Sequence, residues 1–174
     1  MVNKVLGQQL IKIARQEGKF LLKSGVTSNV YWDKFKFESD PKILAKIAAE
    51  LANLLSRRAQ VLGGMELGGI PLVTALSAKT GLPATYIRKE TKKYGTTKKF
   101  EGAVIKDKRT ILVEDIVTSG GSVKDGIIAL REAGAVVDKV VCVILRSEQT
   151  RVVVQSLGIK LEYLFTMAEL DSLL

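Results

Sequence analysis

The sequence predicts an α/β fold in which helices cover both faces of a central parallel sheet. Short apolar runs typical of buried strands alternate along the chain with segments whose apolar residues recur at helical spacing. This alternation favours a parallel sheet, because each strand then returns to the same edge through a helical crossover. The chain has 174 residues, of which 47% are hydrophobic. That is enough to close one core, so we expect a single domain spanning residues 1–174.

Two helices are predicted in the first third of the chain. Asn3 can cap a helix in which apolar residues from Val5 to Ala14 recur at helical spacing, and Gly18 is expected to end that helix. The second helix is marked more clearly, because Asp40 supplies an N-cap and Pro41 takes the first helical position. The apolar residues that follow line one face of this helix.

Strands and helices then alternate toward the carboxyl terminus. Predicted strands cover residues 60–65, 84–87, 110–113 and 136–145. A helix beginning at Pro71 follows the first of them, and a helix ending at Ala133 follows the third. Residues 149–157 stay ambiguous, because three consecutive valines favour a strand while their position favours a helix. Thr166 and Glu169 fit a capping box at the start of a terminal helix.

Composition excludes several kinds of chemistry. The net charge of +9 predicts attraction to anions, without deciding between nucleic acid, phosphorylated metabolites and acidic membranes. The absence of histidine removes Ser-His and Cys-His nucleophile pairs and histidine metal sites. The single cysteine, Cys142, lies in an apolar run and cannot form an intrachain disulfide, which fits a reducing compartment. No segment is long and apolar enough to span a bilayer, so we expect a cytoplasmic protein.

The most informative segment is residues 110–122, TILVEDIVTSGGS. A predicted buried strand runs into two adjacent acids, Glu114 and Asp115, and then into a loop of small hydroxyl residues and glycines that opens a helix. The glycines allow close backbone approach, and loop amides, hydroxyls and the helix N-terminus can all donate hydrogen bonds to a monophosphate. The acids would repel a phosphate, so they must serve a neutral or cationic group, such as sugar hydroxyls or a magnesium-bound water.

Two other segments could also bind anions. Residues 66–71 join a strand to a helix start and could hold a second anionic group on their backbone amides. Residues 88–102 carry six basic side chains and little apolar content, which predicts a mobile surface loop at about 89–102. This loop is either a solvated basic segment without a function or a lid that neutralises a leaving anion and excludes water.

Residues 110–122 resemble the motif with which type I phosphoribosyltransferases bind phosphoribosyl pyrophosphate (PRPP). The resemblance implies that Glu114 and Asp115 hold the ribose hydroxyls and that residues 118–122 hold the 5'-phosphate. It implies contacts to PRPP from Ile116, Val117, Thr118, Ser119, Gly120, Gly121 and Ser122. In the same family the loop containing Gly68 and Gly69 binds pyrophosphate. Some members carry a lysine where Gly68 stands, so in this chain backbone contacts would have to suffice.

The basic segment resembles the catalytic loop of orotate phosphoribosyltransferases in particular. Its pattern Arg-Lys-Glu-x-Lys-x-x-Gly begins at Arg88. The resemblance implies that Arg88, Lys89 and Lys92 are catalytic pyrophosphate ligands, with Asp115 near the positive charge that develops on the sugar. Tyr94 stands where the family commonly has histidine, and a phenol can donate a hydrogen bond but carries no positive charge near neutrality.

Residues 18–33 contain Leu-Lys-Ser-Gly followed by an aromatic pair, and this run resembles the orotate-side motif of the same family. The resemblance implies that Lys23 contacts the pyrimidine and that Tyr31 and Trp32 flank its ring, although such a pair is equally compatible with a core position. Arg146 matches the family's orotate-binding arginine, whose guanidinium suits a planar ring bearing a carboxylate. Thr118 matches an additional orotate contact, and Leu145 stands where the family often has aspartate.

The resemblance covers nearly the whole chain and implies a type I phosphoribosyltransferase fold with a small hood, made mainly of residues 1–35 and the C-terminal segment. It implies transfer of ribose 5-phosphate from PRPP to orotate in pyrimidine (UMP) biosynthesis. Mg²⁺ would be bound through PRPP rather than by the protein alone. A homodimer with active sites shared between subunits is also implied, without nucleic acid or membrane partners.

Two alternatives stay open at this point. One is a PRPP-sensing transcriptional regulator built on the same fold, which the excess of basic residues would suit. Such a regulator should carry a DNA-binding element outside the fold, and 174 residues leave no room for a separate one. The other is a phosphoribosyltransferase for a purine or for uracil. Those enzymes lack the segment around Lys23 and would not need Arg146 for a carboxylate.

Overall fold

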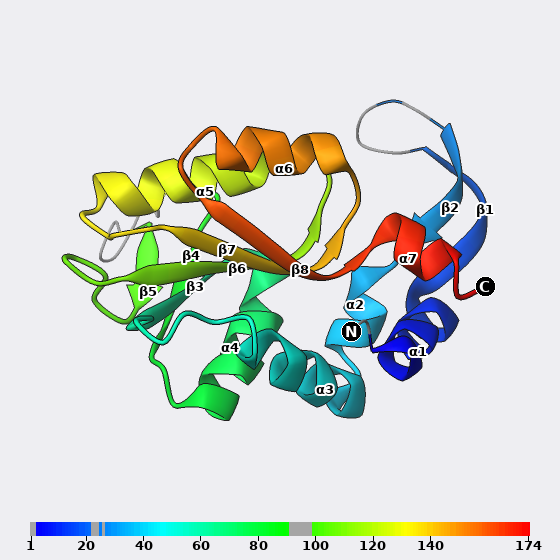
Figure 1. The fold of residues 1–174 in the computed structure, drawn as a ribbon, viewed down its shortest axis with the longest axis horizontal. Coiled ribbons are helices and arrows are strands. Elements are labelled where there is room, and N and C mark those ends of the chain that lie inside the picture. Colours follow the sequence, from blue (N-terminus) through cyan, green and yellow to red (C-terminus); the bar gives the residue numbers. More distant parts are fainter. Residues whose placement is uncertain (1–2, 22–24, 26, 91–98) are drawn as a thin grey trace.

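A computed structural model describes residues 3–21, 25, 27–90 and 99–174. Its main feature is a six-stranded sheet between two layers of helices, with a two-stranded hairpin beyond one end (Figure 1). The strand order is β5-β4-β3-β6-β7-β8, and every neighbouring pair is parallel except β4 and β5. The predicted α/β fold with a central parallel sheet is therefore confirmed. The strands of this sheet are β3 (Val61–Met65), β4 (Ala84–Ile87), β5 (Phe100–Gly102), β6 (Thr110–Val117), β7 (Lys139–Leu145) and β8 (Lys160–Thr166).

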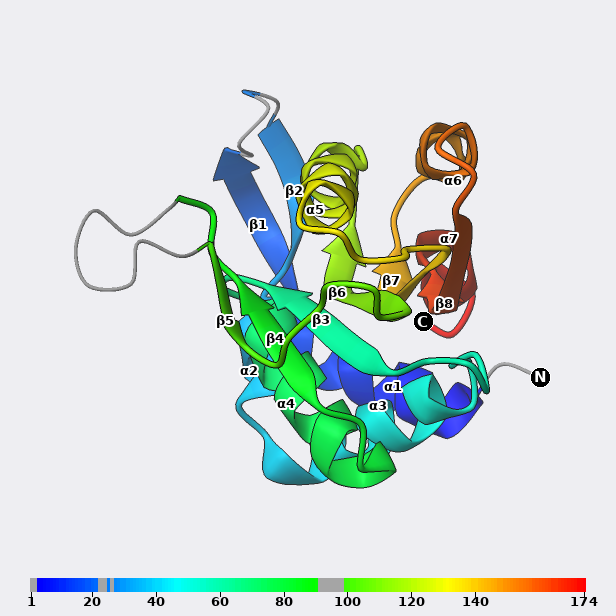
Figure 2. The ribbon, with the colours of Figure 1, turned by 90° about the vertical axis from the view of Figure 1, so that its left-hand side faces the viewer.

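Helices cover the two faces of the sheet as separate layers (Figures 1 and 2). One layer contains α3 (Pro41–Ala52) and α4 (Gly69–Thr80), and the other contains α5 (Gly121–Glu132) and α6 (Glu148–Gln155). The central strand β6 contributes to both cores, because successive side chains of a strand point to opposite faces. Ile111 and Val113 pack in the core beneath α3 and α4, whereas Leu112 packs in the core beneath α5.

The N-terminal segment differs from the prediction. α1 (Lys4–Ala14) is capped by Asn3 as expected, but it ends at Ala14 rather than continuing to Gly18. Residues 15–21 instead form β1 (Arg15–Leu21), which pairs antiparallel with β2 (Thr27–Trp32). The last apolar residue at helical spacing is Ala14, where α1 ends, and the polar residues 15–17 pair their backbone with β2 instead of extending the helix. Gly18 lies where the register of the hairpin shifts.

Local signals at the other helix starts were reliable. The Asp40 side chain accepts hydrogen bonds from the amides of Lys42 and Ile43 at the start of α3. The capping box between Thr166 and Glu169 is present at the start of α7 (Met167–Asp171). The short helix α2 (Lys34–Glu38), which follows the hairpin, was not predicted.

The structure moves several predicted boundaries. α4 begins at Gly69, two residues before Pro71, and β6 continues to Val117 instead of ending at Val113. The strand predicted at 136–145 begins only at Lys139. The ambiguous valine segment is helical and forms α6, in which Val154 is buried while its two preceding valines are exposed.

Two expectations drawn from composition can be compared with the structure. Cys142 is a buried free thiol in β7, and burial raises its pKa well above the ordinary value, so it is a core residue as predicted. None of the helices in the described part of the chain is both long and apolar enough to cross a bilayer.

Candidate active site

The predicted site segments meet at one edge of the sheet, beyond the carboxyl ends of four adjacent strands. Gly68 follows β3, Arg88 follows β4, the glycine-rich loop 118–120 follows β6, and Arg146 follows β7. In open α/β sheets, ligands bind in the crevice at this edge. The structure therefore brings together the segments that the sequence predicted separately.

The loop after β6 has the shape expected of a phosphate cradle. Thr118 and Ser119 are exposed, and Gly120 adopts a left-handed conformation with φ of +78° that suits glycine. Within the described residues no side chain caps α5, so the amides of its first turn are free to bind an anion. Thr150 of α6 is buried behind the loop and donates a hydrogen bond to the carbonyl oxygen of Thr118. This contact holds the loop from its far side.

Two acids and a lysine form the floor of the site. Glu114 and Asp115 are both buried near the end of strand β6. One carboxylate oxygen of Asp115 accepts a hydrogen bond from the amide of Ile116. The other oxygen accepts from the Lys34 ammonium at 2.5 Å. Lys34 is the first residue of α2, so this ion pair ties the segment after the hairpin to the centre of the sheet.

A third acid lies close to this ion pair. Glu38, at the end of α2, is buried, and neither of its carboxylate oxygens has a hydrogen-bond partner. Burial, together with the negative charge of Asp115, raises the pKa of Glu38 to about 8, and Lys34 offsets part of that effect. The same two causes raise the pKa of Glu114 to about 8.

Lys34 keeps its charge in this cluster. Burial alone would lower its pKa, but attraction to Asp115 and the hydrogen bond between them, with smaller contributions from Glu38 and Glu114, raise the pKa above the ordinary value. Near neutral pH the cluster therefore contains one ion pair and two protonated glutamic acids. A floor with little net charge can bind neutral hydroxyl groups without repelling an anion bound at a neighbouring loop.

The loop after β3 passes directly over this cluster. A Cβ atom on Gly68 would lie 1.6 Å from Asp115 Oδ2 and 2.8 Å from Lys34 Nζ, and one on Gly69 would lie 2.9 Å from the Val113 carbonyl oxygen. Gly68 has ordinary helical φ and ψ, so its lack of a side chain serves close approach rather than an unusual backbone conformation. The loop can therefore lie against the acids only if both positions are glycine.

The root of the basic segment is joined to the same loop. The Glu66 carboxylate accepts a hydrogen bond from the Lys89 amide at 2.5 Å, and the Arg88 amide donates to the Lys99 carbonyl oxygen at 2.9 Å. The Arg88 side chain is half-buried and Lys89 is exposed. The last three residues of the predicted lid form β5 rather than loop. Lys92 and Tyr94 lie outside the described residues.

The structure separates the predicted aromatic pair. Trp32 is 6% exposed and belongs to the core, whereas Tyr31 is 42% exposed and packs against Phe20 with ring centroids 5.4 Å apart. Adjacent residues of a strand point to opposite faces, so the two side chains do not flank a common ring. Lys23, predicted on the same side of the site, lies outside the described residues.

Arg146 lies beside the phosphate cradle. Its amide donates to the Val117 carbonyl oxygen at 2.9 Å, which joins the residue after β7 to the last residue of β6. The side chain is half-buried. Within the part of the chain that the structure describes, its guanidinium has no hydrogen bond or ion pair. A half-buried, unpaired guanidinium at the edge of the sheet is available for an anionic group of a ligand.

Sequence reasoning missed Lys34, Glu38, Glu66 and Thr150. The first two belong to α2, whose five residues are too few for a periodic pattern. A basic residue two positions after the aromatic pair was the only local sign of Lys34. Thr150 lies in the ambiguous valine segment, where nothing local indicates that its hydroxyl reaches the glycine-rich loop.

Comparison with known proteins agrees with this geometry. Residues 37–158 match the family model described as phosphoribosyl transferase domain. The chain is 43% identical over 167 residues to an orotate phosphoribosyltransferase of Nocardioides sp., covering 96% of this chain and 93% of the relative. A crystal structure of the Mycobacterium tuberculosis orotate phosphoribosyltransferase superposes with a TM-score of 0.87 at 25% identity, covering 96% and 97% of the two chains. The enzyme from Aeropyrum pernix superposes with a TM-score of 0.82 at 28% identity, covering 96% of both chains.

Proposed function

The chain belongs to the orotate phosphoribosyltransferases and transfers ribose 5-phosphate from PRPP to orotate, and we propose that it does so with the loops at the carboxyl edge of its sheet. The observation that supports this assignment of residues is the meeting at that edge of the glycine-rich cradle, the buried acids and two arginines, Arg88 and Arg146, whose guanidinium groups have no partner among the described residues. Relatives of this kind match nearly the whole chain, which sets aside both a regulatory protein and a transferase for another base.

In the proposed mechanism, PRPP spans the edge from the cradle to the loop after β3. Residues 118–122 hold the 5'-phosphate, Glu114 and Asp115 hold the ribose hydroxyls, and the backbone at Gly68 and Gly69 faces the pyrophosphate. The bond between C1 of the ribose and the pyrophosphate oxygen breaks, and the bonding electrons leave with the pyrophosphate. An orotate ring nitrogen then forms the new bond to C1 from the opposite face, and its N–H proton passes to the released pyrophosphate or to water. Arg88, Lys89 and Lys92 stabilise the leaving charge, while Asp115 stabilises the cationic sugar.

Mg²⁺ is the proposed cofactor, and it would arrive bound to PRPP. The buried acids suit this role poorly as sole ligands, because Glu114 holds a proton near neutral pH and Asp115 already pairs with Lys34. The ion adds positive charge to the leaving pyrophosphate when it is bound. The carboxylate of Asp115 and the carboxyl group of Glu114 are left to bind ribose hydroxyls or a magnesium-bound water.

Orotate is proposed to bind between the cradle and the hairpin. The Arg146 guanidinium would donate paired hydrogen bonds to the pyrimidine, and Thr118 would contact it from the cradle. Lys23 and the exposed Tyr31 would approach from the hairpin, with the buried Trp32 holding β2 in place. The hairpin with Lys23, Tyr31 and Trp32 belongs to the proposed hood of this single domain, and the segment at about 89–102 is its proposed lid.

The direct test incubates the protein with PRPP and one base at a time. Orotate should be consumed, with pyrophosphate released in equal amount, only when PRPP and Mg²⁺ are both present. Uracil and adenine should react at least about 100-fold more slowly, because the Arg146 guanidinium would then lack its carboxylate partner. Equal turnover of either base would overturn the assignment of this site to orotate.

A shared-site homodimer is the proposed assembly, with Arg88, Lys92 and Tyr94 of one subunit reaching the neighbouring site. Lys23→Ala and Lys92→Ala chains, each nearly inactive alone, would be mixed and reassorted. About half of the dimers should then be mixed and have one intact site, so activity should recover to about a quarter of wild type. A lid that served its own subunit would restore none. We further propose that the reaction takes place in the cytoplasm, where a buried free thiol such as Cys142 is stable.

A further inference from the structure

The ammonium of Lys34 lies in the space that a side chain at position 68 would fill. Its Nζ atom is 2.5 Å from Asp115 Oδ2, and the ideal Cβ position on Gly68 is 2.8 Å from Nζ and 1.6 Å from the same carboxylate oxygen. Lys34, Gly68 and Asp115 therefore meet at one point, although they come from α2, the loop after β3 and the end of β6. No cation was predicted at this point from the sequence, and only backbone contacts were expected in the pyrophosphate loop.

Lys34 is only partly exposed, and its ion pair with Asp115 does not use all of its hydrogen-bond donors. Its side chain is 33% exposed, whereas the Asp115 carboxylate that it pairs with is 4% exposed. The ammonium has three protons and no acceptor function, and among the described residues Asp115 is its only hydrogen-bond partner. It can therefore bind Asp115 and still donate to an anion that arrives from the open side.

The surrounding charges hold the ammonium in place. The charge of Asp115 attracts it, and among the described residues no other basic side chain contacts the same carboxylate. The carboxylate itself is oriented from two sides, by Lys34 and by the Ile116 amide. A lysine held in this way needs little reorganisation when a phosphorylated ligand binds.

We propose that Lys34 is a PRPP-binding residue, which orients Asp115 toward the ribose and supplies the pyrophosphate loop with the positive charge that Gly68 lacks. This inference rests on the proposed function of the site and adds to it a residue from outside the phosphate-binding loops. Glycine at position 68 is needed for this arrangement, because any side chain there would displace either the Lys34 ammonium or the Asp115 carboxylate.

The test compares Lys34→Met with Lys34→Arg and with a matched control, Lys36→Met. Lys36 lies in the same short helix, is exposed, and forms no ion pair in the described part of the chain. Lys34→Met should weaken binding of PRPP and of pyrophosphate with Mg²⁺ by about 10- to 100-fold, as expected when a charge-assisted hydrogen bond is lost. The KM for orotate should change less than about threefold. Lys34→Arg should recover part of the loss, and Lys36→Met should behave as wild type.

Two further variants keep the inference testable if Lys34→Met does not fold. Gly68→Ala leaves both charged residues in the chain but pushes them apart, so it should raise the KM for PRPP in the same direction. In an Asp115→Asn background, Lys34→Met should still weaken pyrophosphate binding, because the ammonium contacts the ligand directly. No effect in that background would overturn the direct contact.

The proposed function and the proposed role of Lys34 would be contradicted by different results. A wild-type protein that does not consume orotate with PRPP and Mg²⁺ would contradict the function proposed for the site. A fully active wild type whose Lys34→Met variant binds PRPP and pyrophosphate normally would contradict only the role of Lys34.

Discussion

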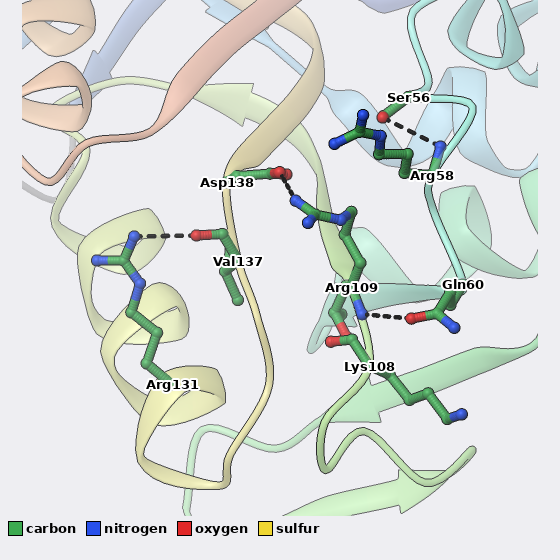
Figure 3. Close-up of polar contacts among 9 residues, drawn as sticks. Ser56, Arg58, Gln60, Lys108, Arg109, Arg131, Val137 and Asp138 are labelled. Atoms are coloured by element: carbon green, nitrogen blue, oxygen red, sulfur yellow. Dashed lines mark hydrogen bonds and ion pairs between the residues drawn. The ribbon is translucent and has the colours of Figure 1, made fainter.

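The two edges of the sheet use charged residues in opposite ways. At the amino edge, Arg109 pairs with Asp138, and its amide donates to the Gln60 side chain (Figure 3). Arg131 donates to the carbonyl oxygens of Val137 and Leu157 at 2.9 and 3.1 Å. At the carboxyl edge, by contrast, the guanidinium groups of Arg88 and Arg146 have no partner among the described residues.

The acids show the same contrast in burial. Asp138 at the amino edge is 43% exposed at its side chain and forms an ion pair with a residue that is itself 31% exposed. Glu114 and Glu38 at the carboxyl edge are buried, and both have a pKa raised to about 8. Burying acids this way costs stability unless a ligand makes use of them. The charged groups at the amino edge are paired within the fold, and those at the carboxyl edge are the ones proposed to meet a ligand.

The largest expected effect comes from a matched pair of acids. Asp115→Asn should lower kcat/KM by about 10²- to 10³-fold, because the variant loses the charge that is proposed to face the ribose in the transition state. Asp138→Asn should keep kcat/KM within about twofold, since its charge acts only within the fold. Steady-state kinetics with PRPP and orotate measure both. Similar losses in the two variants would remove the functional distinction between the edges.

A matched pair of arginines separates ligand binding from stability. Arg146→Ala should weaken orotate binding by about 2 to 4 kcal/mol and leave PRPP binding nearly unchanged, because the charged partner proposed for the orotate carboxylate is lost. Arg131→Ala should leave both affinities unchanged but lower the free energy of unfolding by about 1 to 2 kcal/mol, because two carbonyl groups lose their donor. Titration calorimetry and urea unfolding give the two readouts. Loss of PRPP affinity in Arg146→Ala would mean that this arginine is misassigned.

The pH dependence of stability tests the buried acids. The pKa of Glu38 in the folded protein is about 8, above its ordinary value of 4.5. Between these two pH values Glu38 is therefore protonated in the folded protein and ionised in the unfolded chain. The contribution of Glu38 to stability is therefore complete below about pH 4.5 and is lost as the pH rises through 8. Glu38→Gln has no such loss.

Urea unfolding of Glu38→Gln and wild type at pH 5 and pH 8 measures this difference. Between pH 5 and pH 8, the free energy of unfolding of wild type should fall by about 2 kcal/mol relative to that of Glu38→Gln. This difference is smaller than the shift in pKa alone would give, because neighbouring groups adjust to the new charge. Asp33, Lys34, Glu114 and Asp115 all face Glu38 and are unchanged in both proteins. A constant difference between the two proteins would show that Glu38 titrates normally.

The smallest effect is expected for the ion pair at the amino edge. Arg109→Ala should lower the free energy of unfolding by only about 0.5 to 1 kcal/mol, because both partners are partly exposed and water screens their attraction. Its kinetic constants should match those of wild type. A loss of activity without a loss of stability would show that the amino edge also takes part in catalysis or ligand binding, which is not expected.

Local signals explain why much of the fold could be predicted from the sequence. Asp40 and Pro41 determine the start of α3, and Thr166 with Glu169 determines the start of α7, since each cap joins residues within four positions of each other. The glycine-rich loop after β6 was also predictable, because phosphate-binding amides and hydroxyls are consecutive in the sequence. Family resemblance added roles for residues, such as Arg146, that local chemistry leaves undefined.

Tertiary structure decided what depended on distant partners. Arg15 leaves the helical pattern because it pairs with Trp32 across the hairpin. The valines of α6 are helical in a position where Thr150 supports the loop at Thr118. Neither pairing can be inferred from spacing along the chain.

The contrast is clearest at the floor of the site. The sequence by itself determined that Glu114 and Asp115 follow a buried strand, because hydrophobic runs and adjacent acids are local facts. Only the fold brought Lys34, 81 residues away from Asp115, into the space above Gly68. That contact exists because the fold brings the start of α2 to the end of β6, and burial in the folded protein gives Glu38 its raised pKa. Charge and burial of this kind depend on the neighbours that folding provides.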